Sequence, residues 1–257
     1  MSANLPVPLL EAKAVAKHFG GVKALRDVSL TIRRGEIYGL IGPNGAGKTT
    51  FFNCMTGLYV PDGGGFVFAG APLVADAPHR AAERGIARTF QNIRLFGNMT
   101  ALENVMVGRH VRTRAGVLGA MLNNAATKAE EAAIRQRAID LLHYVRIEDR
   151  ADDLAKNLSY GDQRRLEIAR ALATEPKLLC LDEPAAGMNA TETAELRELI
   201  EGIRRDGTTI LLIEHDVKLV MGLCDRVAVL DYGALVIEDV PAVVQKDQRV
   251  IEAYLGA

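Results

Sequence analysis

The sequence predicts an α/β fold with a mainly parallel sheet and helices on both of its faces. Two observations predict it. Apolar runs with the length of buried parallel strands occur at residues 37–41, 177–182 and 208–213. Each run is followed along the chain by a segment with helical spacing, the order that produces parallel strand pairing.

Composition limits the classes of protein to consider. The 257 residues suffice for one large domain or two small ones, and 49% of them are hydrophobic, enough for a sizeable core. The net charge of −1 does not favour a nucleic acid partner. Cys54, Cys180 and Cys224 lack metal-like spacing, which suits small core residues in a reducing compartment.

The chain start has no basic segment followed by a long apolar one, so we expect no signal peptide. No window reaches about eighteen consecutive apolar residues, so we also expect no transmembrane helix. These features predict a soluble, cytosolic protein, which leaves docking on a membrane protein open.

The stretch from Gly42 to Thr49 follows the pattern Gly, four residues, Gly-Lys-Thr, which is typical of a phosphate-binding loop. A strand precedes it and helix-forming residues follow it. Its glycines allow backbone N–H groups to surround a phosphate, and the helix start adds partial positive charge. Lys48 would reach the terminal phosphates and the Thr49 hydroxyl would bind Mg²⁺. The alternative, a glycine-rich turn with a chance lysine, does not account for the flanking strand and helix.

Before this loop, residues 9–19 and 22–32 alternate as strands, and a flexible turn at 61–65 precedes a strand at 66–70. Phe19 offers a ring that could stack on a nucleotide base. The residues by themselves favour the alternative, an ordinary core phenylalanine.

A short helix at 80–84 precedes a buried strand at 86–90 that ends at Gln91. A glutamine at the carboxyl end of such a strand is well placed to face a ligand, although by itself it is weak support.

Strand signals vanish over residues 92–158, which predicts a helical insert. Thr100 with Glu103 forms a capping-box pattern, and 125–145 is rich in helix formers. Residues 109–114 form a basic patch or a solvated surface, and 116–122 pack on the domain or on a partner. After the insert, Ser159 can cap a helix over 164–173, and Gly161 permits close approach of an anion.

The strand at 177–182 ends in Asp182 and Glu183. In a protein with a phosphate loop, the first acid after such a strand holds Mg²⁺, which leaves Glu183 to act on the attacking water. An acidic surface turn is the alternative, and the apolar strand disfavours it. His215 follows the strand at 208–213 on the same predicted edge, where it could sense a terminal phosphate; a structural histidine is the alternative. A helix at 217–223, a strand at 226–230, a hairpin turn at 231–234 and a helical tail complete the chain.

The order of these features resembles the nucleotide-binding subunits of ABC transporters. The resemblance rests on the phosphate loop, Gln91, the Ser159–Gly161 signature, the acids at 182–183 and His215, and it covers nearly the whole chain. A narrower group, the ATP-binding subunits of branched-chain amino acid importers, is similar over residues 89–96, 99–105, 182–189, 213–216 and 253–256.

The resemblance implies a P-loop NTPase core with an antiparallel β subdomain and a helical subdomain. It implies one nucleotide-binding domain over 1–257, with the core at 8–91 and 165–240, the helical subdomain at 92–164 and a helical tail at 241–257.

The resemblance also implies roles for residues. Phe19 stacks on adenine, Gln91 touches Mg²⁺ and the attacking water, and Ser159 with Gly161 closes on the ATP of the opposite subunit. Asp182 holds Mg²⁺, Glu183 is the catalytic base and His215 contacts the γ-phosphate. The expected nucleotide-binding residues of the loop are Gly42, Asn44, Gly45, Ala46, Gly47, Lys48, Thr49 and Thr50, with Thr49 also a metal ligand.

Two stretches depart from the family pattern. Tyr160 replaces the first glycine of the signature, as is usual for the amino acid importers, and Asp162 replaces its glutamine. Asp162 brings negative charge to an anion site, which is tolerable if the side chain points away. Asn189 occupies the position of the family's cross-subunit aspartate.

The function implied is ATP hydrolysis that energises import of branched-chain amino acids. Alternatives are an ATPase for urea or short amides, one for lipopolysaccharide export, or an ABC ATPase without a transport role. The implied cofactors are ATP and Mg²⁺. The implied partners are an identical or related ATP-binding subunit, membrane permease subunits at the cytoplasmic face and, indirectly, a solute-binding protein, with no nucleic acid.

Overall fold

The computed structural model describes residues 7–74, 77–109 and 125–255. The chain divides into two compact units. The first unit comprises residues 1–86 and 177–257, and the second comprises residues 87–176. The helical subdomain predicted at 92–164 falls within the second unit, and its boundaries stay a prediction.

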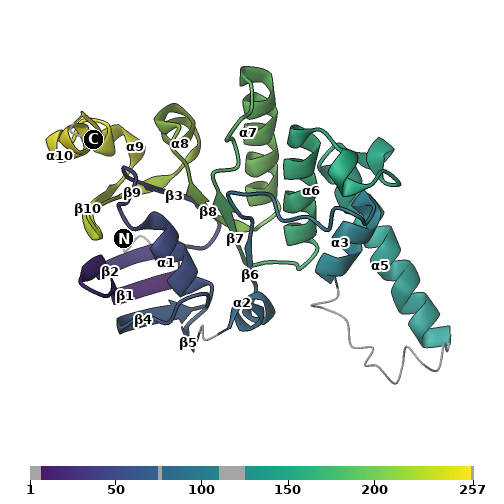
Figure 1. The fold of residues 1–257 in the computed structure, drawn as a ribbon, viewed down its shortest axis with the longest axis horizontal. Coiled ribbons are helices and arrows are strands. Elements are labelled where there is room, and N and C mark those ends of the chain that lie inside the picture. Colours follow the sequence, from purple (N-terminus) through teal and green to yellow (C-terminus); the bar gives the residue numbers. More distant parts are fainter. Residues whose placement is uncertain (1–6, 75–76, 110–124, 256–257) are drawn as a thin grey trace, which may run out of the picture. The chain divides into compact units, whose positions relative to one another are not determined.

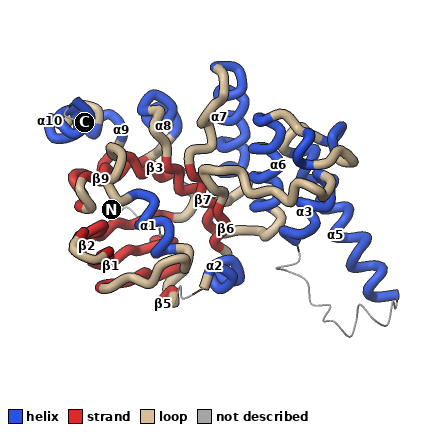
Figure 2. The backbone as a smooth tube through the Cα atoms, in the orientation of Figure 1, coloured by secondary structure: helices blue, strands red, loops and turns tan. Residues whose placement is uncertain are grey.

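An antiparallel sheet of four strands lies at the start of the first unit, in the order β2-β1-β4-β5 (Figures 1 and 2). Its strands are β1 Pro8–Phe19, β2 Val22–Arg33, β4 Gly63–Phe68 and β5 Ala71–Leu73. The strand expected at 66–70 therefore begins three residues earlier. Gly64 has φ +66°, and a Cβ there would lie 2.1 Å from the Ala14 carbonyl oxygen, so the glycines belong to the pairing with an irregular part of β1.

A larger sheet has the order β10-β9-β3-β8-β7-β6, in which β9, β3, β8 and β7 run parallel and β10 is antiparallel. Its strands are β3 Ile37–Ile41, β6 Ile86–Arg88, β7 Leu178–Asp182, β8 Thr209–Ile213, β9 Arg226–Asp231 and β10 Ala234–Asp239. The central strands β3, β7 and β8 are buried throughout, as their apolar runs predicted.

Helices cover both faces of this sheet, which confirms the predicted fold class. The helices of the first unit are α1 Lys48–Met55, α2 Pro78–Arg84, α7 Ala190–Arg205, α8 Val217–Leu223, α9 Pro241–Val244 and α10 Gln248–Leu255. On one face, Phe51 and Phe52 of α1 share a core with both sheets. On the other, α8 packs so closely on β3 that a Cβ at Gly39 would lie 2.9 Å from Val220. The predicted helical tail is thus two helices.

The second unit is helical, as the loss of strand signals predicted. Its helices are α3 Ala101–Arg109, α5 Ala125–Tyr144 and α6 Tyr160–Leu172, with 3₁₀ turns at Glu148–Arg150 and Ala155–Asn157. Thr100 and Glu103 form the predicted capping box, with bonds of 2.8 and 3.1 Å between side chains and backbone N–H groups. Of the basic patch at 109–114 only Arg109 is described, and the apolar run at 116–122 lies outside the described residues.

The helix expected from Arg164 begins at Tyr160, and the strand expected to reach Gln91 ends at Arg88. Strand β5 was not predicted, and of β10 only the hairpin turn at 231–234 that leads into it was predicted. Each carries a weak pattern, and pairing with a neighbouring strand defines both.

The contact between α3 and α6 generates a stability prediction. A Cβ at Gly108 would lie 2.3 Å from the Arg170 carbonyl oxygen, so Gly108→Ala should force the helices apart and cost roughly 1–3 kcal/mol. Gly97→Ala is the matched control, because its Cβ would meet Lys156 at an ordinary 3.5 Å. Thermal unfolding followed by circular dichroism measures both; equal melting temperatures for the two variants would contradict the close packing.

Candidate functional site

Three loops meet at one edge of the large sheet. In the parallel register, Leu40 of β3 and Asp182 of β7 both pair with Ile213 of β8. The segments that follow these strands are the phosphate loop, Glu183 and the Glu214–His215 pair, and they therefore lie side by side. The prediction of one shared edge holds for these three loops of the first unit.

Steric constraints shape the phosphate loop. Gly42 has φ +151°, and a Cβ there would lie 2.1 Å from the Leu230 carbonyl oxygen. Gly47 has φ +102°, and its Cβ would lie 2.6 Å from the Ala24 carbonyl oxygen. Neither position accepts a side chain, because the backbone of β9 and β2 occupies the space. Gly47 is also the N-cap of α1, so the unpaired N–H groups of that helix open onto the loop.

Lys48 is buried at the start of α1. Its ammonium donates to the carbonyl oxygens of Gly42, at 2.6 Å, and Pro43, at 3.0 Å. Burial lowers the pKa of Lys48, while the negative charges of Glu183 and Asp182 act in the opposite direction. The lysine and the two acids thus form one electrostatic cluster, in which a cation in low dielectric faces two anions.

The two acids occupy different environments. Asp182 is the last residue of β7 and is buried. Glu183 follows with φ +50°, a left-handed conformation that is strained for a residue with a side chain. The Glu183 N–H donates to the Ile213 carbonyl at 2.9 Å, and its carboxylate contacts Nε2 of His215. Residues held in this way cluster at functional sites, which supports a role for this pair.

Glu214 was not predicted as a site residue. It is 4% exposed, and its carboxylate accepts from the N–H groups of Ala185, at 2.8 Å, and His215, at 3.1 Å. Burial raises the pKa of Glu214, and the nearby charge of Glu183 adds to that rise, whereas the bonds to the N–H groups lower it. The carboxylate ties the turn after Glu183 to the segment that holds His215. In the sequence, the only indication of a role for Glu214 was its position between an apolar strand and a histidine.

Asn189 has a local role in this structure. Its side chain accepts from the N–H groups of Thr191 and Glu192, at 2.9 and 3.0 Å, and so caps α7. The Glu192 carboxylate in turn accepts from the Asn189 N–H at 2.9 Å, which completes a capping box. An asparagine performs this capping as well as an aspartate.

Phe19 ends β1 and is 43% exposed, so the alternative that it is an ordinary core residue is wrong. Its ring meets Tyr59 edge-on, with centroids 5.2 Å apart, and the Lys17 ammonium lies 5.6 Å from its centroid. Asp62 fixes this strand end through Lys17, at 2.9 Å, and the His18 N–H, at 2.6 Å. These bonds lower the pKa of Asp62 to about 2. Phe19 therefore offers an anchored, accessible aromatic surface.

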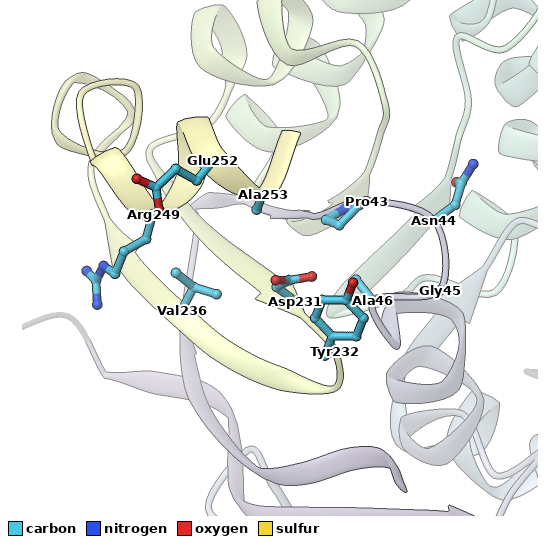
Figure 3. A pocket seen from close by; sticks show the side chains of 10 residues that line it. All are labelled: Pro43, Asn44, Gly45, Ala46, Asp231, Tyr232, Val236, Arg249, Glu252 and Ala253. Atoms are coloured by element: carbon cyan, nitrogen blue, oxygen red, sulfur yellow. The ribbon is translucent and has the colours of Figure 1, made fainter. Parts of the chain in front are cut away.

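A pocket of about 740 Å³ adjoins the phosphate loop (Figure 3). The lining residues are Pro43, Asn44, Gly45, Ala46, Asp231, Tyr232, Val236, Arg249, Glu252 and Ala253. The last three belong to α10, so the C-terminal helix and the phosphate loop form walls of the same pocket, an arrangement that the sequence did not predict. Burial raises the pKa of Tyr254 on the same helix, and the nearby Gly42 N–H opposes that rise.

Ser159, Gly161 and Gln91 lie in the second unit. Ser159 is the N-cap of α6, as predicted: its hydroxyl accepts from the Asp162 N–H at 3.2 Å. The same hydroxyl donates to the Asp162 carboxylate at 2.7 Å, so Asp162 turns back onto the cap. Gln91 lies in the loop after β6, where its carbonyl accepts from Arg164. Gly161 is in the first turn of α6.

The donor set suits a magnesium ion better than a transition metal. Thr49 and Asp182 offer the hard oxygen ligands that Mg²⁺ prefers. Within residues 7–74, 77–109 and 125–255, no three His, Cys, Asp or Glu side chains gather as a metal-binding group. None of the helices that the structure describes has the length and apolar character to cross a membrane.

Comparison with known proteins identifies the family of this chain. Residues 25–186 match the ABC transporter family. This chain belongs to that family. It is 46% identical to the high-affinity branched-chain amino acid transport ATP-binding protein LivG of Salmonella typhimurium over 250 residues, which cover 97% of this chain and 98% of that protein.

Solved ABC structures agree with the fold. An ATP-binding cassette of an ABC transporter in its ADP conformation superposes with a TM-score of 0.85 at 30% identity, covering 98% of this chain and all of that one. A dimeric cassette in a post-hydrolysis state, bound to ADP and Pi, superposes with a TM-score of 0.76 at 26% identity and covers 90% of this chain and 98% of that one.

The bonds of Glu214 generate a prediction for this ABC protein. Glu214→Gln places an amide NH₂ where one oxygen accepts from backbone N–H groups, so unfolding should require roughly 1–3 kcal/mol less. The turn that carries Glu183 should loosen, and the rate of ATP hydrolysis should fall with it. Glu201→Gln, on the exposed face of α7, is the control. Thermal unfolding and phosphate release measure both; a Glu214→Gln protein as stable as the control would contradict the role of this carboxylate.

Proposed function

We propose that this chain is the ATP-hydrolysing subunit of an ABC importer for branched-chain amino acids. The observation that carries the proposal is the 46% identity to LivG along nearly the whole length of both chains. The arrangement of Lys48, Glu183 and His215 at one strand edge supports the enzymatic part independently.

The proposed nucleotide site begins at Phe19, whose exposed ring stacks on the adenine base. The backbone N–H groups of the phosphate loop and of the first turn of α1 surround the phosphates, and Lys48 neutralises their charge. An incoming phosphate competes with the carbonyls that Lys48 binds in this structure. The proposed nucleotide-binding residues are Phe19, Gly42, Asn44, Gly45, Ala46, Gly47, Lys48, Thr49 and Thr50.

Hydrolysis requires a group that accepts a proton from the attacking water. Glu183 is the proposed base, because its carboxylate lies beside Lys48 and its strained backbone holds it at the strand edge. His215 contacts that carboxylate and so orients it, and the same imidazole faces the γ-phosphate in the proposal. Thr49, Asp182 and Gln91 are the proposed ligands of Mg²⁺, which would neutralise charge on the β- and γ-phosphates.

The active form proposed is a dimer in which Ser159 and Gly161 of one subunit complete the nucleotide site of the other. The capped start of α6 suits this role, because its unpaired N–H groups attract a phosphate. The dimeric cassette with ADP and Pi supports such an assembly. The second subunit is either identical or a related ATP-binding chain.

The partners proposed are permease subunits that hold the dimer at the cytoplasmic face of the plasma membrane, and a solute-binding protein that delivers the amino acid from outside. Closure of the dimer on ATP and its opening after hydrolysis would shift the permease between inward-facing and outward-facing states.

Glu183→Gln tests the enzymatic proposal. The variant should bind ATP normally and hydrolyse it roughly 100-fold more slowly or worse, because an amide accepts no proton from water. Glu192→Gln, which alters only the capping box of α7, should hydrolyse ATP at the normal rate. Nucleotide binding and phosphate release distinguish the outcomes; full turnover by Glu183→Gln would refute the assigned base.

The transport proposal needs a separate measurement. With its permease and binding protein in proteoliposomes, ATP hydrolysis should rise on addition of leucine, isoleucine or valine and should not rise with urea. Stimulation by urea alone would reject the proposed cargo while leaving the ATPase assignment intact.

A further inference from the structure

A buried ion pair lies on α6 of the second unit. Arg164 and Glu167 stand one turn apart, 2% and 1% exposed, with 3.1 Å between Nη1 and Oε2. Removing two charges from water is costly, and apolar residues of similar volume would pack a helix at least as well. The pair therefore calls for an explanation beyond stability.

The explanation lies in what else the pair binds. Nη1 of Arg164 donates to the Phe90 carbonyl at 2.6 Å, and Nη2 donates to the Gln91 carbonyl. Oε1 of Glu167 accepts from the N–H groups of Phe90, at 3.3 Å, and Arg94, at 3.5 Å. Four backbone groups of one loop thus bond to one ion pair.

This loop, residues 89–94, belongs to neither a helix nor a strand. Backbone groups outside a helix or strand need other partners, and here two buried charged side chains supply what a neighbouring strand would otherwise supply. Arg94 and Arg88 also stack on the Phe90 ring, with guanidinium carbons 4.4 and 5.0 Å from its centroid. The backbone at Gln91 is accordingly fixed to α6, while its side chain is left exposed.

The Arg164 guanidinium also contacts the signature at residues 159–161. Its Nη2 donates to the Tyr160 hydroxyl at 3.1 Å, and Tyr160 stands between Ser159 and Gly161. The general family pattern has a glycine at this position, which offers no such acceptor. The tyrosine in the signature therefore has a structural reason: one guanidinium contacts the first residue of α6 and the carbonyl of Gln91 together.

We propose that Arg164 is a positioning residue that fastens the Gln91 loop to the start of α6, so that Gln91 and Ser159 move as one body. The inference rests on the proposed function, in which Gln91 meets the ATP of its own subunit and Ser159 meets that of the partner. Through Arg164, the position of Gln91 on one ATP sets the position of Ser159 at the other. Glu167 holds the guanidinium in the required orientation.

Arg164→Lys tests the proposal in the full-length protein. Lysine keeps the charge but lacks the planar fork, so it cannot bind Phe90, Gln91 and Tyr160 together. The maximal rate of ATP hydrolysis should fall about tenfold, since small misplacement of catalytic groups is costly. The ATP concentration at half-maximal rate should change less than about twofold, because Phe19 and the phosphate loop are untouched. Amide hydrogen exchange at Phe90 and Arg94 should accelerate.

Arg165→Lys is the matched control. Arg165 is the next residue of α6, and its guanidinium donates to the Val145 carbonyl at 3.0 Å, on another segment. It should keep the exchange rates at Phe90 and Arg94 and a maximal rate within about twofold of the unaltered protein. Equal effects of the two substitutions would mean that Arg164 only stabilises α6, and the proposal would fail. Faster exchange with an unchanged maximal rate would also overturn it.

Tyr160→Phe covers the case in which Arg164→Lys does not fold. This change removes one hydroxyl from a half-exposed ring, so folding is preserved. A maximal rate reduced about threefold, with faster exchange at Phe90 and Arg94, supports the proposal, and unchanged values of both reject it. The proposed function is tested separately, by ATP hydrolysis in the unaltered protein and its loss in Glu183→Gln. A failure of the ATPase proposal can therefore be told apart from a failure of the positioning role of Arg164.

Discussion

The close approach of three backbone segments at the phosphate loop is the constraint on which the rest of the site depends. Gly42 lies against the carbonyl of Leu230, and Gly47 against that of Ala24. Gly233, in the turn between β9 and β10, bonds both to the phosphate loop and to β2. Its N–H donates to the Ala46 carbonyl at 3.0 Å, and its carbonyl accepts from the Arg26 N–H at 2.7 Å. The antiparallel sheet, the loop and the β9–β10 turn are thereby held in one arrangement, in which Lys48 is buried and feels the negative charges of Asp182 and Glu183.

Local chemistry explains why much of the fold could be predicted from the sequence. The buried strands, the loop with its following helix and the capping box at Thr100 depend on residues close together in the chain. Glu183 and His215 were predictable as neighbours because parallel strands end at a common edge. The three-residue strand β5 was not predicted because its pairing with β4 defines it. For β10, the sequence predicted only the hairpin turn before the strand.

The features that the sequence did not predict depend mainly on contacts between distant parts of the chain. Glu214 is important because a strand end and the turn after β7 meet, and the sequence shows only an acid beside a histidine. The pocket shared by α10 and the phosphate loop brings together positions about 200 residues apart, and Arg164 bonds to carbonyls 73 and 74 residues earlier. The departures at Asp162 and Asn189 were visible in the sequence, yet their bonds to Ser159 and to α7 required coordinates.

The left-handed backbone of Glu183 has a consequence for evolution and engineering. Glycine adopts φ +50° without steric cost, so a glycine at this position would relieve roughly 1 kcal/mol of strain or more. Glycine also loses more conformational entropy on folding, which offsets part of this relief, so selection for thermal robustness alone does not preserve the carboxylate. Any programme that screens variants of this chain for heat resistance should be expected to admit inactive proteins at this position, unless catalysis is selected at the same time.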